Sequence, residues 1–337
     1  MPKRSRVPTV IRPGSRKPKA RWDEERRSQL LLIVLGAVVL LAVALIAIFG
    51  YYQTKVRPKG ETVLQVGNRS FSLDYFERRL RYDIRQGNST YAANPTSAAA
   101  LLLNEIETEE LMRRGAPEKG VDLSDDAVDA QIRTNESVPT NADRNTFAVF
   151  YREAVRSSGL TTEGYRDVIA ADIAKNAIQP MFQAEAPATA DQVRFRVIVL
   201  TTESDAQAAL QRLKNGEDFA TVAQQVSEDT ASKDSGGEQD WLPRGVAEQA
   251  LDEALFSLDI GQISDVISGT NALFIVQVEE RQAQRETTDT QKSLLASQAQ
   301  QKWLTDLRDR VGVTTSLSNA QRNTLLTVVQ SETAKAQ

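Results

Sequence analysis

The sequence has 337 residues and a formal net charge of −4, and it contains neither cysteine nor histidine. The missing cysteines exclude disulfides and cysteine-ligated metal sites, and the missing histidines exclude Ser-His-Asp catalysis and nearly all zinc enzymes. A carboxylate-only Ca²⁺ or Mg²⁺ site stays open chemically, but EF-hand and P-loop spacings are absent, so we expect no metal and no cofactor.

The charge is unevenly distributed along the chain. Residues 1–27 carry ten basic and three acidic residues, and residues 30–49 form an uninterrupted apolar run. About 20 apolar residues span the hydrocarbon core of a bilayer, and basic flanks stay on the cytoplasmic side. We therefore predict a cytoplasmic tail (1–28), a single transmembrane helix (29–52) and an extracytoplasmic location for the remaining chain.

A cleaved signal peptide is the alternative for this segment, because Ala42-Val43-Ala44 matches a small-residue cleavage motif. The motif lies inside the apolar run, and the run is longer than a typical signal-peptide core, which favours the uncleaved anchor. The basic tail is then a topology signal. We expect the lipid bilayer as a partner and expect no nucleic-acid binding.

The segment 61–183 reads as a hairpin followed by helices. Gly67-Asn68 separates two short strand-like runs, which is typical of a hairpin. Ser72, Ser124 and Thr161 each precede an amphipathic stretch, as N-cap residues do. The predicted helices cover residues 73–84, 97–114, a stretch from 125, a stretch from about 146, and 162 to 180 or 182, with loops at 87–95 and 136–144 and a linker at 184–190.

The segment 193–280 has a different pattern. Residues 193–200 alternate as a strand, and two apolar stripes at helical spacing follow, separated by Asn215-Gly216. A glycine-rich loop, a third helix and two strands complete the order. The motifs that carry a family resemblance are Asn215-Gly216-Glu217-Asp218-Phe219, Ser227-Glu228-Asp229, Ser235-Gly236-Gly237, Trp241-Leu242-Pro243-Arg244-Gly245, Ala254-Leu255-Phe256-Ser257-Leu258 and Gly261-Gln262-Ile263-Ser264.

In this order and spacing, the segment resembles a parvulin-type (PpiC or rotamase) peptidyl-prolyl isomerase domain. The resemblance implies an α+β domain over residues 190–282 that binds X–Pro segments. The family's two histidine positions fall on Val197 and Phe274, its acid or thiol position on Asp229, and its hydroxyl position near Asn271. Asp229 keeps the family's chemistry and Asn271 can donate a hydrogen bond, so these two are the catalytic candidates.

The resemblance also implies a peptide-binding groove. Its usual Met and Phe positions fall on Ala247 and Leu251, and a position that is commonly Leu is Gln239. The expected groove residues are Val197, Trp241, Ala247, Leu251 and Phe274. Several alternatives stay open: Val197 and Phe274 as ordinary core residues, Asp229 as a turn-forming carboxylate, and Trp241 as a packing residue.

The preceding helical region resembles the N-terminal domain of SurA-, PrsA- and PpiD-type foldases in the spacing of Leu73-Asp74-Tyr75-Phe76, Leu123-Ser124-Asp125-Asp126 and Ser158-Gly159-Leu160-Thr161. The resemblance implies that a helix predicted over residues 288–310 packs back on this domain. A free or dimerising helix is the alternative. Residues 316–337 are polar with a short apolar patch, and we expect them to be loosely held.

The predicted fold class is therefore α+β, with a transmembrane helix, a mainly helical SurA-like domain, a parvulin-like domain and a returning C-terminal helix. The predicted divisions are 1–28, 29–52, 61–183, 190–282 and 288–337. The resemblance implies a membrane-anchored foldase for unfolded or newly exported polypeptides. The alternatives are a non-catalytic holdase and a single-pass membrane scaffold, and the oligomeric state stays open.

Overall fold

A computed structural model of the chain describes residues 41, 43–46 and 57–336 and divides it into two units, residues 1–61 and 62–337. In the first unit, residues 41 and 43–46 are helical and α2 spans Arg57–Gly60. The predicted tail 1–28 and nearly all of the predicted transmembrane segment 29–52 lie outside the described residues. Within the described ranges, no helix is long and apolar enough to cross a bilayer.

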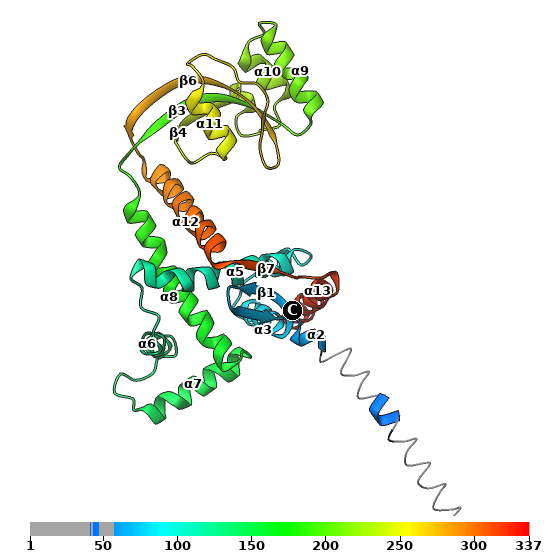
Figure 1. Ribbon diagram of the computed structural model, residues 1–337, viewed down its shortest axis with the longest axis vertical. Helices are drawn as coiled ribbons and strands as arrows, with labels where there is room; N and C mark the ends of the chain where they lie inside the picture. The colour runs from blue at the N-terminus through cyan, green and yellow to red at the C-terminus, as the bar shows by residue number, and fades with distance from the viewer. Residues whose placement is uncertain (1–40, 42, 47–56, 337) are drawn as a thin grey trace, which may run out of the picture. The chain divides into compact units, whose positions relative to one another are not determined.

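The second unit begins with a hairpin, continues through six α-helices, and then forms a sheet-containing lobe before two final helices (Figure 1). The elements before the lobe are β1 (Thr62–Val66), β2 (Arg69–Ser72), α3 (Leu73–Arg85), α4 (Thr90–Ala93), α5 (Ala98–Gly115), η2 (Ala116–Lys119), α6 (Asp125–Asn135), α7 (Arg144–Ser158) and α8 (Thr162–Glu185). The lobe and the final segment contain β3 (Thr189–Leu200), α9 (Glu203–Lys214), α10 (Phe219–Val226), η3 (Lys233–Ser235), β4 (Glu238–Pro243), α11 (Gln249–Ser257), β5 (Ile267–Ser268), β6 (Leu273–Glu286), α12 (Asp289–Val311), β7 (Val313–Thr315) and α13 (Asn319–Ala336).

The N-cap predictions are confirmed, because the side chains of Ser72, Ser124 and Thr161 each accept a hydrogen bond from a backbone N–H in the first turn of their helices. Some boundaries differ from the prediction. The predicted loop 87–95 contains the short helix α4, and α7 begins at Arg144, two residues early, because Asp143 supplies its cap.

Helix α8 passes through Pro180 and ends at Glu185, beyond the predicted end. Proline removes one backbone donor from a helix. The carbonyl that loses its partner belongs to Asn176, an exposed residue, so it can bind water. Ile178 and Phe182 on either side are buried in the core, and their packing outweighs the lost hydrogen bond.

The core of the helical part is built from both ends of the second unit. The prediction that the C-terminal helix packs back is confirmed, because Leu304 and Leu307 of α12 are buried in the same cluster as Leu80 and Leu102. Trp303 lies 5.7 Å from Phe182 between ring centroids. Strand β7 extends the hairpin into a three-stranded antiparallel sheet of order β2-β1-β7, which the sequence did not predict.

The C-terminal segment was expected to be loosely held, and this expectation is wrong. Residues 319–336 form α13, which packs along α3 (Figure 1). The apolar patch supplies Leu325, Val328 and Val329, all buried in the core of the helical part. Glu332, one helical turn further on, binds Arg81 and Arg85 of α3 at 2.7 and 3.1 Å. Spacing of three and four residues places these side chains on one face.

The lobe contains a four-stranded antiparallel sheet of order β4-β3-β6-β5. One apolar cluster lies between the sheet and the helices α9 and α10, and a second includes residues of β3, β6 and α11. Strand β3 begins at Thr189, four residues before the prediction, so little remains of the predicted linker. Strand β4 was not predicted as a strand.

We expect Leu325→Ala to lower the free energy of unfolding by about 2–5 kcal/mol, because it leaves a cavity at a fully buried site in the core. The matched control is Thr327→Ala on the exposed face of the same helix, which should change it by no more than about 0.5 kcal/mol. Denaturant unfolding of both variants measures the difference. Equal effects would show that α13 does not belong to the core.

Candidate functional site

The loop that carries Asp229 is attached to the central strand β3 by backbone and hydroxyl hydrogen bonds. The N–H of Glu228 donates to the carbonyl of Val199 at 2.8 Å. The hydroxyl of Ser227, which is fully buried, accepts from the N–H of Val199 at 3.2 Å and from the N–H of Asp229 at 3.3 Å. These bonds hold Asp229 at the end of α10, beside the sheet.

The carboxylate of Asp229 is engaged by its own loop and by β4. One oxygen accepts from the N–H of Ala231 at 3.2 Å. The other accepts from the hydroxyl of Ser232 and from the amide of Gln239 at 3.3 Å. Asp side chains commonly hold turns in this way. Both oxygens of the half-buried carboxylate therefore already have donors within the protein.

Ser232 was not singled out in the sequence, although a signal for it was present. An Asp followed three residues later by Ser is a spacing at which two side chains of one tight turn meet, and here the Ser hydroxyl donates to Asp229. Gln239 was noted only as a departure from a common Leu, and its bond to Asp229 depends on β4, which the sequence did not reveal.

The candidates Val197, Leu251 and Phe274 meet in one apolar cluster with Leu255 and Val276. Val197 is almost fully buried on β3 and pairs with Val276 of β6. Leu251 and Phe274 are half-buried and pack against this cluster from α11 and β6. The structure thus places three of the five expected groove residues together, in a cluster formed by β3, β6 and α11.

Ala247 and Asn271 lie in the loops at the margin of this region. Ala247 is half-buried in the turn that precedes α11, and Asn271 is exposed in the bend between β5 and β6. None of the hydrogen bonds made by Asp229 in the described structure reaches Asn271. The two catalytic candidates are therefore not joined in one hydrogen-bonded unit.

Glu248 joins these two loops and was missed by the sequence reasoning. Its carboxylate accepts from the N–H of Thr270 at 2.8 Å and from the Thr270 hydroxyl at 3.0 Å. Gly269 lies directly beneath, where an added Cβ would meet the Phe274 ring at 2.4 Å. The hydrogen bonds of Glu248 thus link the start of α11 to the β5–β6 turn, next to the ring of Phe274.

Trp241 is not part of the apolar cluster. Its neighbour Leu242 packs there, and adjacent residues of a strand point to opposite faces. The Trp241 ring instead lies under the guanidinium of Arg285, 4.7 Å from the ring centroid, and its carbonyl accepts from Gln291 of α12 at 2.7 Å. Trp241 therefore lies where the lobe meets α12.

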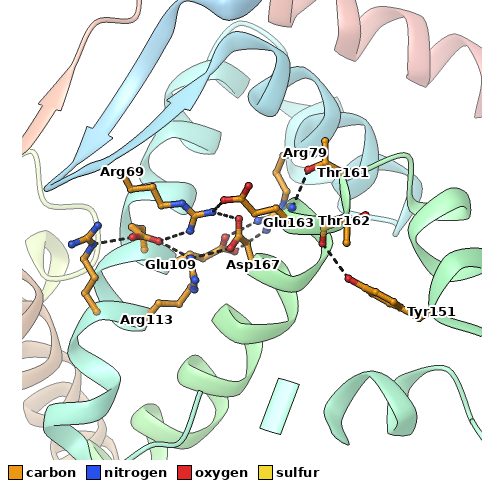
Figure 2. A network of polar contacts seen from close by, with 12 residues as sticks. Arg69, Arg79, Glu109, Arg113, Tyr151, Thr161, Thr162, Glu163 and Asp167 are labelled. Carbon is orange, nitrogen blue, oxygen red and sulfur yellow. Dashed lines mark hydrogen bonds and ion pairs between the residues drawn. The ribbon is translucent and has the colours of Figure 1, made fainter. Parts of the chain in front are cut away.

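The helical part contains a second polar site, a network of buried ion pairs (Figure 2). Arg69 of β2 and Arg113 of α5 both bind Asp167 of α8, and both also bind Glu110. Beside this network, a cleft of about 640 Å³ is lined by charged side chains and by Leu123, Val128 and Ala170. No cluster of acidic side chains in the described ranges is arranged to hold a metal ion.

Comparison with known families assigns both parts of the chain. Residues 189–282 match the PPIC-type PPIase domain, and residues 24–179 match the SurA-like N-terminal domain. The chain unites a SurA-like N-terminal domain with a PPIC-type PPIase domain. The PPIase domain is the lobe with the sheet β4-β3-β6-β5, and the SurA-like match ends within α8, so it covers the part of the helical core that precedes the lobe.

Similar proteins include foldases and a chaperone. The foldase protein PrsA of Caldanaerobacter subterraneus is 28% identical over 178 residues, which are 53% of this chain and 56% of that protein. The chaperone SurA of Methylobacillus flagellatus is 33% identical over an alignment of 144 residues that covers 38% of this chain and 33% of that protein. The chain thus spans between a third and somewhat over half of these relatives.

Among solved structures, a peptidylprolyl isomerase (PrsA) from Bacillus anthracis is 21% identical, with coverage of 70% of this chain and 97% of that one and a TM-score of 0.37.

A close approach of the glycine loop to β3 supports the geometry around Val197. Gly237 has a positive φ of 77°, and a Cβ there would lie 2.3 Å from the carbonyl oxygen of Val197. The Gly237 carbonyl also accepts from the Val197 N–H at 2.8 Å. Only glycine allows this contact, because the opposing atoms are backbone and cannot rotate away.

We expect Gly237→Ala to destabilise the PPIase domain by more than Gly245→Ala. Both positions have positive φ and lose about 1–2 kcal/mol on that account, but Gly245 has open space around its Cβ position. The additional clash at Gly237 must displace the loop from β3. Denaturant unfolding measures both costs, and equal values would show that the loop moves freely.

Proposed function

We propose that the chain is a foldase that binds unfolded or newly exported polypeptides and acts on their X–Pro bonds through its PPIase domain. The observation that carries the proposal is the union of the two domains in one chain. The similarity to a PrsA foldase and a SurA chaperone supports it. The SurA-like domain would supply a binding surface for extended polypeptide, and the PPIase domain a site for proline.

Isomerisation requires neither a nucleophile nor a metal. Rotation about the peptide bond meets a barrier of about 18–20 kcal/mol, because resonance is lost in the twisted state. A catalyst accelerates it by binding the twisted bond more tightly than the planar one. In this chain the half-buried side chains Leu251 and Phe274 would receive the proline ring, and Asn271 would donate a hydrogen bond to the substrate backbone.

The role proposed for Asp229 is to shape the site. Its carboxylate oxygens already accept hydrogen bonds from Ala231, Ser232 and Gln239. A carboxylate with this set of donors holds the loop beside β3 and has little capacity left for a substrate. Asp229 then acts by positioning the loop, and Asn271 is an exposed polar group at the margin of the cluster.

A second candidate function is a holdase whose PPIase domain binds peptide without catalysis. One observation favours it: the two positions where the family usually has histidine hold apolar residues, Val197 and Phe274, and both pack in the apolar cluster. The central polar cluster that is usual in the family is thereby reduced to Asp229 and the loop that carries it. Apolar binding without isomerisation is consistent with this arrangement.

We also propose that residues 29–52 anchor the chain in a membrane with the following domains on the extracytoplasmic side. The apolar run 30–49 and the basic segment before it support this topology. Anchoring would raise the effective concentration of the foldase near newly exported chains.

Activity of the full chain on a proline-containing peptide, measured with a protease that cleaves only the trans form, separates the first two functions. The foldase proposal predicts a rate above the uncatalysed one. It also predicts that Asn271→Ala lowers kcat/KM roughly tenfold, the effect of losing a hydrogen bond of about 1.4 kcal/mol in the transition state. The control is Asn323→Ala on the exposed face of α13, which should leave the rate unchanged. An uncatalysed rate with the folded wild type would contradict the enzyme function.

Suppression of aggregation of an unfolded client tests the holdase function independently. We expect the full chain to suppress aggregation at several-fold molar excess, whether or not it accelerates isomerisation. Failure to suppress aggregation, with isomerase activity present, would leave only the enzyme function.

Deleting residues 1–56 should release the chain from membranes but keep client binding, and retention in the membrane fraction would contradict the proposed anchor.

A further inference from the structure

A buried cluster of charges between α3 and α5 has more carboxylates than cations. The guanidinium of Arg79, 4% exposed, donates to Asp83 at 2.8 Å, to Glu105 at 3.1 Å and to both oxygens of Glu109 at 2.6 and 2.7 Å. One cation therefore serves three carboxylates. Nothing in the proposed function uses this cluster.

Asp83 is the incompletely satisfied member of the cluster. Its side chain is 8% exposed. One carboxylate oxygen accepts from Arg79, and the other is buried with no hydrogen-bond partner in the described structure. A buried charged oxygen without a donor is costly, and the cost is relieved when the carboxyl binds a proton.

The charged surroundings do not compensate for this missing partner. Glu105 accepts from the hydroxyl of Tyr91 of α4, and Glu109 is held by Arg79. On α13, Glu332 is bound by Arg81, Arg85 and Lys335. Titratable and charged groups on the elements around α3 include Arg69 of β2, Tyr91 of α4, Glu105 and Glu109 of α5, Asp172 and Lys175 of α8, and Glu332 of α13.

Of these groups, the cations are engaged elsewhere or exposed. Arg69 binds Glu110, Glu163 and Asp167. Lys175 is exposed on α8. Among the described residues, only Arg79 bonds the carboxylate of Asp83. Burial raises the pKa of Asp83 to about 7, against the opposing effect of Arg79.

We propose that Asp83 is a proton-binding site through which mildly acidic solution tightens the packing of α3 against α5. With Asp83 neutral, the unpartnered oxygen carries no charge, and Arg79 serves Glu105 and Glu109. With Asp83 ionised, the buried cluster gains a negative charge, and one of the two carboxylate oxygens that share it has no donor in the described part of the chain. The SurA-like domain thus contains a pH-responsive contact that is separate from the PPIase domain and does not depend on its activity.

The direction of the pH effect follows from proton binding. An aspartate in an unfolded chain has a pKa of about 3.9, and the pKa of Asp83 in the folded chain is about 7. Between these values the folded state binds more protons than the unfolded state. This group's contribution to stability is therefore fully present below the lower pKa. It falls as the pH rises between the two values and is constant above the upper one.

The test is thermal and denaturant unfolding of the full chain as a function of pH for the wild type and for Asp83→Asn. Titration of Asp83 should raise the unfolding equilibrium constant of the wild type by up to roughly tenfold per pH unit between about pH 4 and 7. We expect Asp83→Asn to lack this component of the pH dependence. The control is Asp74→Asn, which alters an exposed ion pair with Arg78 on the same helix and should retain that component. Identical pH profiles for the wild type and Asp83→Asn would overturn the proposal.

A second measurement covers the case in which Asp83→Asn does not fold. Infrared difference spectra of the folded wild type with isotope-labelled aspartate report directly whether an aspartic carboxyl is protonated. We expect one protonated aspartate at pH 6 that loses its proton near neutrality. Complete ionisation of all aspartates at pH 6 would overturn the proposal without any variant.

Discussion

The antiparallel pairing of β3 with β6 is the constraint on which the domain organisation depends. The register runs from Leu200↔Leu273 near one end of the ladder to Thr189↔Glu286 at the other, so the chain leaves the PPIase domain beside the point where it entered. Helix α8 ends four residues before β3, and α12 begins three residues after β6. The two helices therefore run together, and Trp303 of α12 packs on Phe182 of α8.

A fully buried polar contact secures this junction. The side chain of Gln192 on β3 accepts from Gln291 of α12 at 3.0 Å and from Arg285 at 3.1 Å, and donates to two carbonyls of β6. Gln291 also completes the capping box of α12 with Thr288. Because a buried amide must satisfy its hydrogen bonds, these contacts specify how α12 begins. The SurA-like core is thereby completed by a helix whose first turn is bonded to the PPIase domain.

In both the candidate site and the helical core, the buried polar groups have few hydrogen-bond partners available. In the PPIase domain, the donors that bind the carboxylate of Asp229 hold a loop. The sheet carries an apolar cluster as well as ion pairs between β3 and β6. In the SurA-like domain, ion pairs are buried between helices, where loss of one partner is costly. Arg69 and Arg113 share Asp167 and Glu110 in one network, in which the buried Nε of Arg113 has no acceptor among the residues described. In the cluster around Arg79, one buried oxygen of Asp83 is likewise left without a partner within the described ranges.

The sequence by itself determined the features that depend on neighbours along the chain. Caps such as Ser72 and Thr161, the helical stripes and the central strand follow from spacing and local hydrogen bonding. The ordered motifs indicated the family of each part, which the comparisons confirmed.

Only the tertiary structure decided what depends on distant partners. Strand β7 exists because β1 offers a free edge, and α13 is ordered because α3 offers an apolar face. Likewise, β4 brings Gln239 to Asp229 as a further donor, while Trp241 is directed away from the cluster that contains Phe274. Local pattern cannot reveal such pairings, because the free energy that forms them comes from contacts between segments far apart in the chain.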